Sequence, residues 1–161
     1  TPIFGGGEMI SEVQFSHSLF NILPFRLEAG TPDIAGAIGL AAAINWLQDI
    51  NRKEMKNYKA MLLNQFFEGL NKIGGLDILS SPVHNAGIVA LNVQGEHPAD
   101  VAELLNQQAV AVRGGQHCAM PFFNQLGLAG AVRFSFAPYN NEADVATSLQ
   151  ALTQAVEILT A

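Results

Sequence analysis

The only cysteine of the chain, Cys118, lies in the run Arg113-Gly114-Gly115-Gln116-His117-Cys118-Ala119-Met120-Pro121. A thiolate rather than a thiol is the nucleophile, and neighbouring positive charge favours it, so sulfur chemistry is the first hypothesis. The two glycines allow backbone conformations that other residues avoid, and Pro121 cannot lie in an ordinary helix interior. The run therefore predicts a shaped loop that carries a thiol. A small buried hydrophobic side chain is the competing interpretation of a lone cysteine.

Two arginines accompany this loop. Arg113 follows Val110-Ala111-Val112, and Arg133 interrupts the apolar segment 131–136 without an acidic neighbour in sequence. A guanidinium is a planar fork that matches a carboxylate. Both arginines are therefore candidates for binding an anion. A structural ion pair with a distant acidic residue is the alternative for Arg133.

The histidines give weaker signals. His117 is adjacent to Cys118, but neighbouring side chains of an extended chain point to opposite sides, so a hydrogen bond between them is not assured. A metal site built from His117, Cys118, His84 and His97 lacks recognised ligand spacing, so no metal is predicted.

Two glycine-containing segments could meet a phosphate. Gly30-Thr31-Pro32 stands at a predicted helix start, where free N–H groups and a hydroxyl suit a phosphate. A plain helix cap explains Thr31 equally well. Gly5-Gly6-Gly7 is not followed by the Lys-Ser/Thr of a nucleotide-binding loop, so it is interpreted as a turn.

The composition limits the classes of protein. Charged residues make up 14% of the 161 residues and hydrophobic residues 49%, against about 25% charged in a typical soluble domain. Part of the surface is therefore expected to be covered, by a dimer partner or a companion domain. The net charge of −6 and the lack of a basic cluster argue against nucleic acid. No apolar run long enough for a membrane span occurs, and a single cysteine favours the cytoplasm.

Helical and strand periods alternate along the chain, which predicts an α/β or α+β protein with a small sheet and helices on one face. A short strand and an irregular connection are expected in 8–24. The first helix, nearly apolar all round, should be buried on most sides. The expected helices are 32–49, 51–73, 98–108, 122–126 and 142–159, and the expected strands are 76–79, 87–93 and 131–136.

Four motifs occur in a fixed order. They are Gly5-Gly6-Gly7-Glu8-Met9-Ile10, Phe25-Arg26-Leu27-Glu28-Ala29-Gly30-Thr31-Pro32, Arg113-x-Gly115-x-His117-Cys118-Ala119 and Arg133-x-Ser135-x-x-x-Tyr139-Asn140. In this order they resemble pyridoxal-phosphate-dependent cysteine desulfurases, most closely the sulfur-mobilising desulfurases and cysteine sulfinate desulfinases. The resemblance covers essentially the whole chain.

The resemblance implies roles for individual residues. Cys118 matches the nucleophile that takes sulfur from a cysteine substrate, becoming a persulfide and releasing alanine. Arg133 matches the arginine that binds the substrate carboxylate, and Arg113 lines the same pocket. Thr31 matches the threonine that reaches the cofactor phosphate of the neighbouring subunit in a homodimer. The pair 116–117, Gln and His, is expected to support the cysteine from a second layer.

The resemblance also implies an incomplete site. The family binds pyridoxal 5′-phosphate through a lysine in a Ser-x-His-Lys segment, which is expected before Gly5 and does not occur here. The fold class expected is the small α+β domain of a fold-type I enzyme of this kind, with the end of the large domain over 1–47 and the small domain over 48–161. By itself the chain is expected to be inactive.

The expected physiological role is sulfur supply for iron–sulfur cluster or other sulfur assembly, with a sulfur-acceptor protein as partner. A non-enzymatic persulfide carrier or partner-binding module is the alternative. A third interpretation is that the chain is a piece of a related lyase or aminotransferase that does not use the cysteine. The intact Arg-x-Gly-x-His-Cys run argues against it. Cysteine, cysteine sulfinate and selenocysteine all remain open as substrates.

Overall fold

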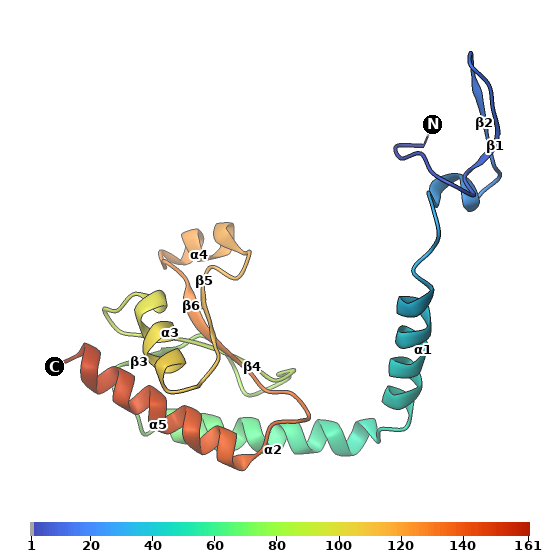
Figure 1. Ribbon diagram of the computed structural model, residues 1–161. Coiled ribbons are helices and arrows are strands. Elements are labelled where there is room, and N and C mark those ends of the chain that lie inside the picture. Colours follow the sequence, from blue (N-terminus) through green and yellow to red (C-terminus); the bar gives the residue numbers. More distant parts are fainter. Residues whose placement is uncertain (1) are drawn as a thin grey trace. The chain divides into compact units, whose positions relative to one another are not determined.

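A computed structural model describes residues 2–161 and divides the chain into two compact units, 1–50 and 51–161 (Figure 1). Each unit is described by itself. No helix among the described residues is both long and apolar enough to cross a membrane.

The first unit holds a small hairpin and a helix. Strands β1 (Ile10–Val13) and β2 (Ser18–Phe20) pair antiparallel, and a short 3₁₀ helix, η1 (Phe25–Leu27), leads toward α1 (Ile34–Gln48). Strand β2 was not predicted, because three residues are too few to show the alternation of apolar and polar side chains that marks a strand. Only its pairing with β1 defines it.

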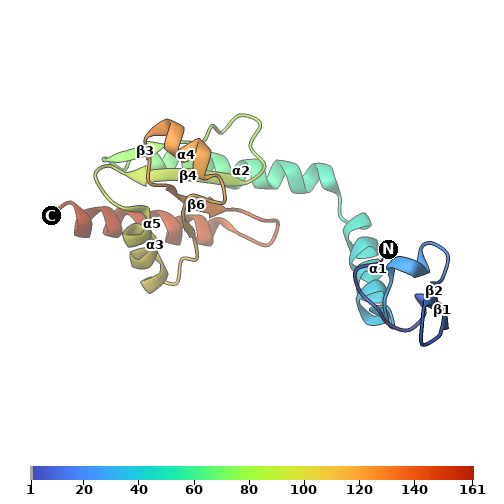
Figure 2. The ribbon, with the colours of Figure 1, turned by 90° about the horizontal axis from the view of Figure 1, so that it is seen from above.

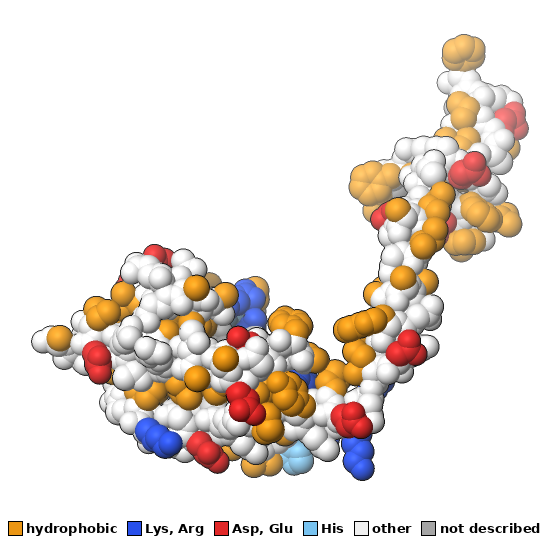
Figure 3. Space-filling model, turned by 60° about the horizontal axis from the view of Figure 1, so that its bottom comes forward, with side chains coloured by type: hydrophobic (Ala, Val, Ile, Leu, Met, Phe, Trp, Pro, Cys, Tyr) orange, Lys and Arg blue, Asp and Glu red, His pale blue; other side chains and the backbone are white. Residues whose placement is uncertain are grey.

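Helix α1 forms where it was predicted, but the expectation that it is buried on most sides is wrong for this chain taken by itself. None of its residues is buried, and Ile38 and Trp46 are both about two-thirds exposed. Figure 3 shows orange side chains along this helix. The apolar pattern shows what the helix is suited to bury, and the first unit does not supply the covering surface.

The second unit contains one four-stranded antiparallel sheet and four helices. The strand order is β3–β4–β6–β5, with β3 (Leu76–Ile78), β4 (Ile88–Val93), β5 (Arg113–Gly115) and β6 (Ala131–Ser135). The helices are α2 (Arg52–Leu70), α3 (Pro98–Gln107), α4 (Met120–Leu126) and α5 (Glu142–Leu159). This architecture confirms the predicted α/β or α+β class with a small sheet, and the pairing of its strands is antiparallel.

Local capping explains where the two long helices begin. Asn51 accepts hydrogen bonds from the N–H groups of the second and third residues of α2. Asn141 and Asp144 form a reciprocal capping box at the start of α5. Helix α2 ends at Leu70, three residues earlier than predicted.

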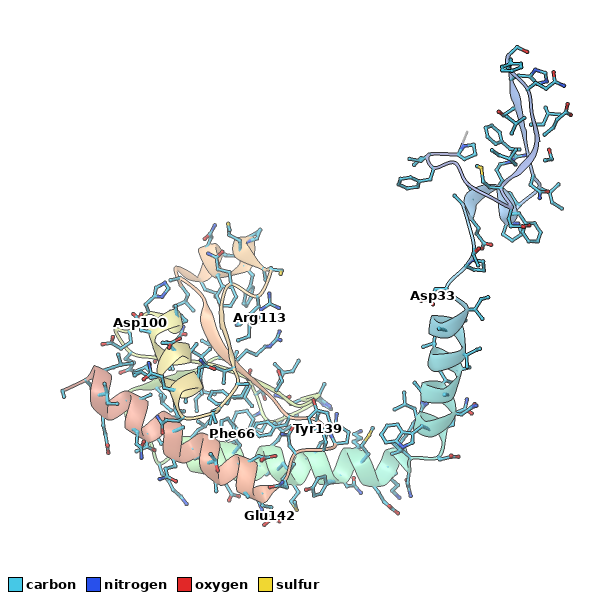
Figure 4. All side chains as sticks on the ribbon, in the orientation of Figure 1. Asp33, Phe66, Asp100, Arg113, Tyr139 and Glu142 are labelled. Carbon is cyan, nitrogen blue, oxygen red and sulfur yellow. The ribbon has the colours of Figure 1, made fainter. Side chains whose placement is uncertain are left out.

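The core lies between the sheet and α2, α3 and α5. Phe66 of α2 is fully buried, and its ring centroid lies 5.0 Å from those of Phe134 and Phe136. Figure 4 labels Phe66 at this core, and Figure 2 shows α2, α3 and α5 on the same unit from above. Because side chains alternate along β6, Val132 and Phe134 face this core and Arg133 faces the other side of the sheet.

Candidate functional site

The two arginines singled out from the sequence are cross-strand neighbours. Arg113 of β5 pairs directly with Arg133 of β6 in the antiparallel register. Residues opposite each other in such a pair project from the same face. In Figure 4, the labelled Arg113 lies on the other side of β5 and β6 from Asp100 of α3. The sheet therefore places two guanidinium groups together on the face opposite the core formed with α2, α3 and α5.

Cys118 lies in a tight turn directly after β5. The N–H of Ala119 donates to the carbonyl of Gln116 at 2.8 Å, which closes a four-residue turn. Both central residues, His117 (φ 51°) and Cys118 (φ 61°), are left-handed. Such a turn normally takes glycine or asparagine at these positions. Left-handed residues other than glycine cost about 1–3 kcal/mol each, so the surrounding structure must hold this turn.

The turn brings the thiol to the first arginine. Nη2 of Arg113 lies 3.2 Å from Sγ of Cys118, within hydrogen-bonding distance for sulfur. Cys118 is exposed. The planar guanidinium holds this donor at a fixed place beside the sulfur. The turn thus presents an accessible sulfur beside a fixed positive charge.

Glycines let the backbones around the turn approach one another closely. A Cβ on Gly114 would lie 2.9 Å from the carbonyl oxygen of Pro98 at the start of α3. A Cβ on Gly130, where φ is 152°, would lie 2.6 Å from the carbonyl carbon of Gly115. Gly114 is therefore required by packing, whereas Gly115, where a Cβ would meet nothing within 4 Å, is required by its backbone conformation (φ 111°).

Arg133 carries an unused hydrogen-bond donor. Its side chain is half-buried, and among the described residues its buried Nε has no hydrogen-bond partner. A buried cationic donor without a partner lowers the stability of the fold, unless a ligand provides the hydrogen-bond acceptor. This geometry suits a small anion that reaches Arg133 beside Cys118.

His117 lies next to the two arginines rather than on the thiol. Its ring packs edge-to-face on Phe123, with centroids 5.8 Å apart, and neither ring nitrogen has a hydrogen-bond partner among the described residues. Burial lowers the pKa of His117, and the charges of Arg133 and Arg113 lower it further. No hydrogen bond joins His117 to Cys118. The imidazole is therefore neutral at neutral pH and serves the turn by packing.

The other predicted residues take different positions. Gln116 is half-buried and contributes its backbone carbonyl to the turn. Thr31 lies in the first unit, is exposed and does not cap α1, because Asp33 accepts the hydrogen bond from Gly36 N at 2.8 Å. The cap interpretation of Thr31 is therefore wrong. The hydroxyl stays available to an oxygen-rich ligand.

The glycine run at the start of the chain forms turns, as expected. The carbonyl of Gly7 accepts from the N–H groups of Met9 (2.8 Å) and Gly30 (3.0 Å). This contact ties the run to the residue before Thr31.

One residue at the site was missed. Asn92 of β4 is buried, and its Nδ2 donates to the carbonyl of Gly130 at 2.9 Å. The available signal was an amide side chain within the otherwise apolar segment 88–93.

The lysines do not gather at Cys118. Three lie on α2, where Lys59 Nζ donates to the carbonyl of Ala86, and Lys72 follows two residues after the helix ends. Among the described residues, no group of three His, Cys, Asp or Glu side chains is arranged to hold a metal ion. The exposed hydroxyl of Thr31 suits a phosphate, and none of these lysines is in the turn that contains Cys118.

The chain is similar to known proteins along nearly its whole length. The probable cysteine desulfurase of Vibrio cholerae is 39% identical over 158 residues, which cover 98% of this chain and 39% of the relative. The crystal structure of the cysteine desulfurase CsdA (S-sulfonic acid) from Escherichia coli matches with a TM-score of 0.80 at 36% identity, over 98% of this chain and 39% of that one. The apo cysteine desulfurase of Thermococcus onnurineus matches with a TM-score of 0.81 at 37% identity, over 97% and 39%.

The chain thus spans about two-fifths of the length of the relatives that it matches. The model of one family, aminotransferase class-V, matches residues 1–147, which include the first unit, most of the second, the Cys118 turn and both arginines. The chain therefore belongs to the aminotransferase class-V family.

Proposed function

We propose that this chain carries the sulfur-accepting cysteine of a pyridoxal-phosphate-dependent cysteine desulfurase. The observation that carries the proposal is the 3.2 Å contact between Arg113 Nη2 and Cys118 Sγ, in a turn that leaves the sulfur exposed. The relatives named cysteine desulfurases, over 30% identical across nearly the whole chain, support the same activity.

The proposed chemistry is sulfur transfer from L-cysteine to Cys118. The Cys118 thiolate attacks the substrate sulfur, a sulfur–sulfur bond forms, and the substrate's carbon–sulfur bond breaks. The substrate carbon keeps the electron pair and takes up a proton, so it leaves as alanine while Cys118 becomes a persulfide. Arg113 donates a hydrogen bond to the sulfur before attack.

Arg133 binds the substrate carboxylate in this proposal. Its buried Nε has no hydrogen-bond partner among residues 2–161, and an incoming carboxylate would accept that donor. The paired Arg113 keeps the local potential positive. The two arginines therefore select an anionic end of the substrate and orient its sulfur toward Cys118.

The cofactor is pyridoxal 5′-phosphate, which acts as an electron sink and makes the substrate sulfur open to attack. In this chain, Thr31 would hold its phosphate, from the neighbouring subunit of a homodimer. The attachment lysine is contributed by sequence outside these 161 residues. Residues 1–47 then form the end of the cofactor-binding domain, and 48–161 form the small domain. The chain by itself is inactive.

The proposed setting is a cytoplasmic homodimer that passes sulfur to an acceptor protein for iron–sulfur cluster or other sulfur assembly. The exposed position of Cys118 supports transfer to a partner. Cysteine sulfinate and selenocysteine carry the same carboxylate and remain alternative substrates.

The test uses the full-length enzyme with L-cysteine, and follows alanine release together with the mass of the peptide that contains Cys118. We expect a persulfide on Cys118 and equal alanine in a single turnover, and neither product with Cys118→Ser. Alanine release from Cys118→Ser at the wild-type rate would contradict the proposal. A persulfide on Cys118 that appears only when another protein supplies the sulfur would favour the carrier alternative.

A further inference from the structure

Asn92 is one of two buried polar side chains in residues 2–161, the other being Ser148. It lies in β4 between Leu91 and Val93, which are 0% and 2% exposed. Asparagine is depleted in strands, and a buried amide is costly unless its hydrogen bonds are made. Core packing alone therefore gives no reason for an asparagine here.

The contacts of the amide show what it provides. Nδ2 donates to the carbonyl of Gly130 at 2.9 Å across 38 residues of sequence, while the buried Oδ1 has no partner among the described residues. An apolar side chain would avoid the cost of the unpaired Oδ1. The single bond to Gly130 is thus what distinguishes asparagine from an apolar residue at this position.

Gly130 is in direct contact with the strand that leads to Cys118. The position of a Cβ on Gly130 is 2.9 Å from Gly115 Cα and 2.7 Å from its carbonyl oxygen. Gly115 is the last residue of β5, and the turn that contains Cys118 begins at the next residue. A shift of the Gly130 carbonyl would therefore be transmitted to the turn through this close backbone contact.

We propose that Asn92 is a positioning residue for Cys118. Its hydrogen bond fixes Gly130 against Gly115, and this contact holds the strained turn that places Sγ beside Arg113. Asn92 touches no reacting atom and acts through the backbone alone. The inference rests on Cys118 being the sulfur acceptor proposed above.

The experiment compares wild-type full-length enzyme with Asn92→Asp, which removes the donor and keeps nearly the same shape. We expect alkylation of Cys118 by iodoacetamide, measured without substrate, to slow by up to about 10-fold, the effect expected when Arg113 no longer contacts the sulfur. We expect kcat for alanine formation to fall by a similar factor. KM for cysteine should stay within about twofold, because Arg133 is unchanged.

Ser148→Ala is the matched control, since it removes the other buried polar side chain, on α5. It should leave the alkylation rate unchanged even where it lowers the thermal midpoint. In the double variant Arg113→Gln/Asn92→Asp, alkylation should be no slower than in Arg113→Gln alone, because the sulfur has already lost its donor. This non-additivity separates positioning from general destabilisation.

Alkylation of folded Asn92→Asp at the wild-type rate, or fully additive effects in the double variant, would overturn the inference. If Asn92→Asp does not fold, Asn92→Leu removes the same donor within an apolar strand and is read in the same way. The alkylation assay needs no desulfurase activity. Suppose that the wild-type enzyme forms no persulfide while the variants show the expected alkylation rates. This result would refute the proposed function and still support the positioning role of Asn92.

Discussion

Arg113 and Arg133 stand directly opposite each other in the antiparallel pair of β5 and β6. Like charges opposite each other destabilise a sheet, and the buried Nε of Arg133 adds the cost of an unpaired donor. We expect an anion that binds between the two side chains to offset this cost.

Replacing Arg133 by alanine should weaken substrate binding and leave the fold at least as stable. The loss of a charged hydrogen-bond donor from a half-buried site costs about 1.5–3 kcal/mol, which corresponds to a rise in KM for cysteine of about 10-fold to 150-fold. Steady-state kinetics and urea unfolding of the full-length enzyme measure both. Arg52→Ala, on α2 in the same unit, is the control and should change neither. An unchanged KM would show that Arg133 does not bind the substrate.

The contact between Arg113 and Cys118 predicts a graded effect on the thiol. Arg113→Gln removes the charge beside the sulfur and should slow alkylation of Cys118 by iodoacetamide about 10-fold at neutral pH. Arg113→Lys keeps the charge but loses the planar guanidinium, so its alkylation rate should lie between those of the wild type and Arg113→Gln. Equal alkylation rates in all three proteins would mean that the 3.2 Å contact has no influence on the sulfur.

Cys118→Gly and Cys118→Ala should differ in stability although both abolish persulfide formation. The φ of 61° at position 118 is disfavoured for alanine and open to glycine. The glycine variant should therefore be more stable than the alanine variant by about 1 kcal/mol. Urea unfolding of the two variants provides the measurement. An alanine variant as stable as the glycine variant would indicate that the turn carries no strain at this position.

Several parts of this structure could be predicted because their causes are local. The starts of α2 and α5 depend on side chains within one turn, Asn51 with Glu54 and Asn141 with Asp144. All five α-helices lie near their predicted bounds, and α2 and α5 were predicted from the helical spacing of their apolar residues. The thiol loop was predicted from its glycines and from Pro121, which do not depend on distant residues.

Other parts depend on contacts between distant segments. The opposition of Arg113 and Arg133 follows from the register of β5 on β6, which no local pattern encodes. Asn92 was missed because its partner, Gly130, lies 38 residues away. The burial predicted for α1 failed for a third reason, since an apolar helix does not specify which surface will cover it.

His117 predicts a pH dependence of stability. Its pKa is lowered in the folded protein from an ordinary value of 6.5, by burial first and then by Arg133 and Arg113. The unfolded chain therefore takes up a proton at a higher pH than the folded chain. This contribution to stability is complete above pH 6.5 and is lost as the pH falls through the lower folded value.

The measurement for His117 is the urea midpoint of wild type and His117→Phe at about pH 7.5 and about pH 5.5. Phenylalanine keeps an aromatic ring against Phe123 and cannot be protonated. The wild type should lose more stability on acidification than the variant. The reverse order, or identical losses, would show that His117 is not held neutral by its surroundings.

Two left-handed glycines allow the packing around the Cys118 turn to be tested against backbone freedom alone. At Gly130 a Cβ would lie 2.6 Å from Gly115 C, whereas at Gly127 (φ 68°) nothing lies within 4 Å. Gly127→Ala should therefore cost only the conformational penalty of about 1 kcal/mol. Gly130→Ala must in addition push β6 away from β5, so it should cost at least about 3 kcal/mol and slow alkylation of Cys118. Thermal unfolding and the alkylation assay on both variants make the comparison. If the two variants were equally stable and equally reactive, the close approach of Gly130 and Gly115 would have no role in holding Cys118.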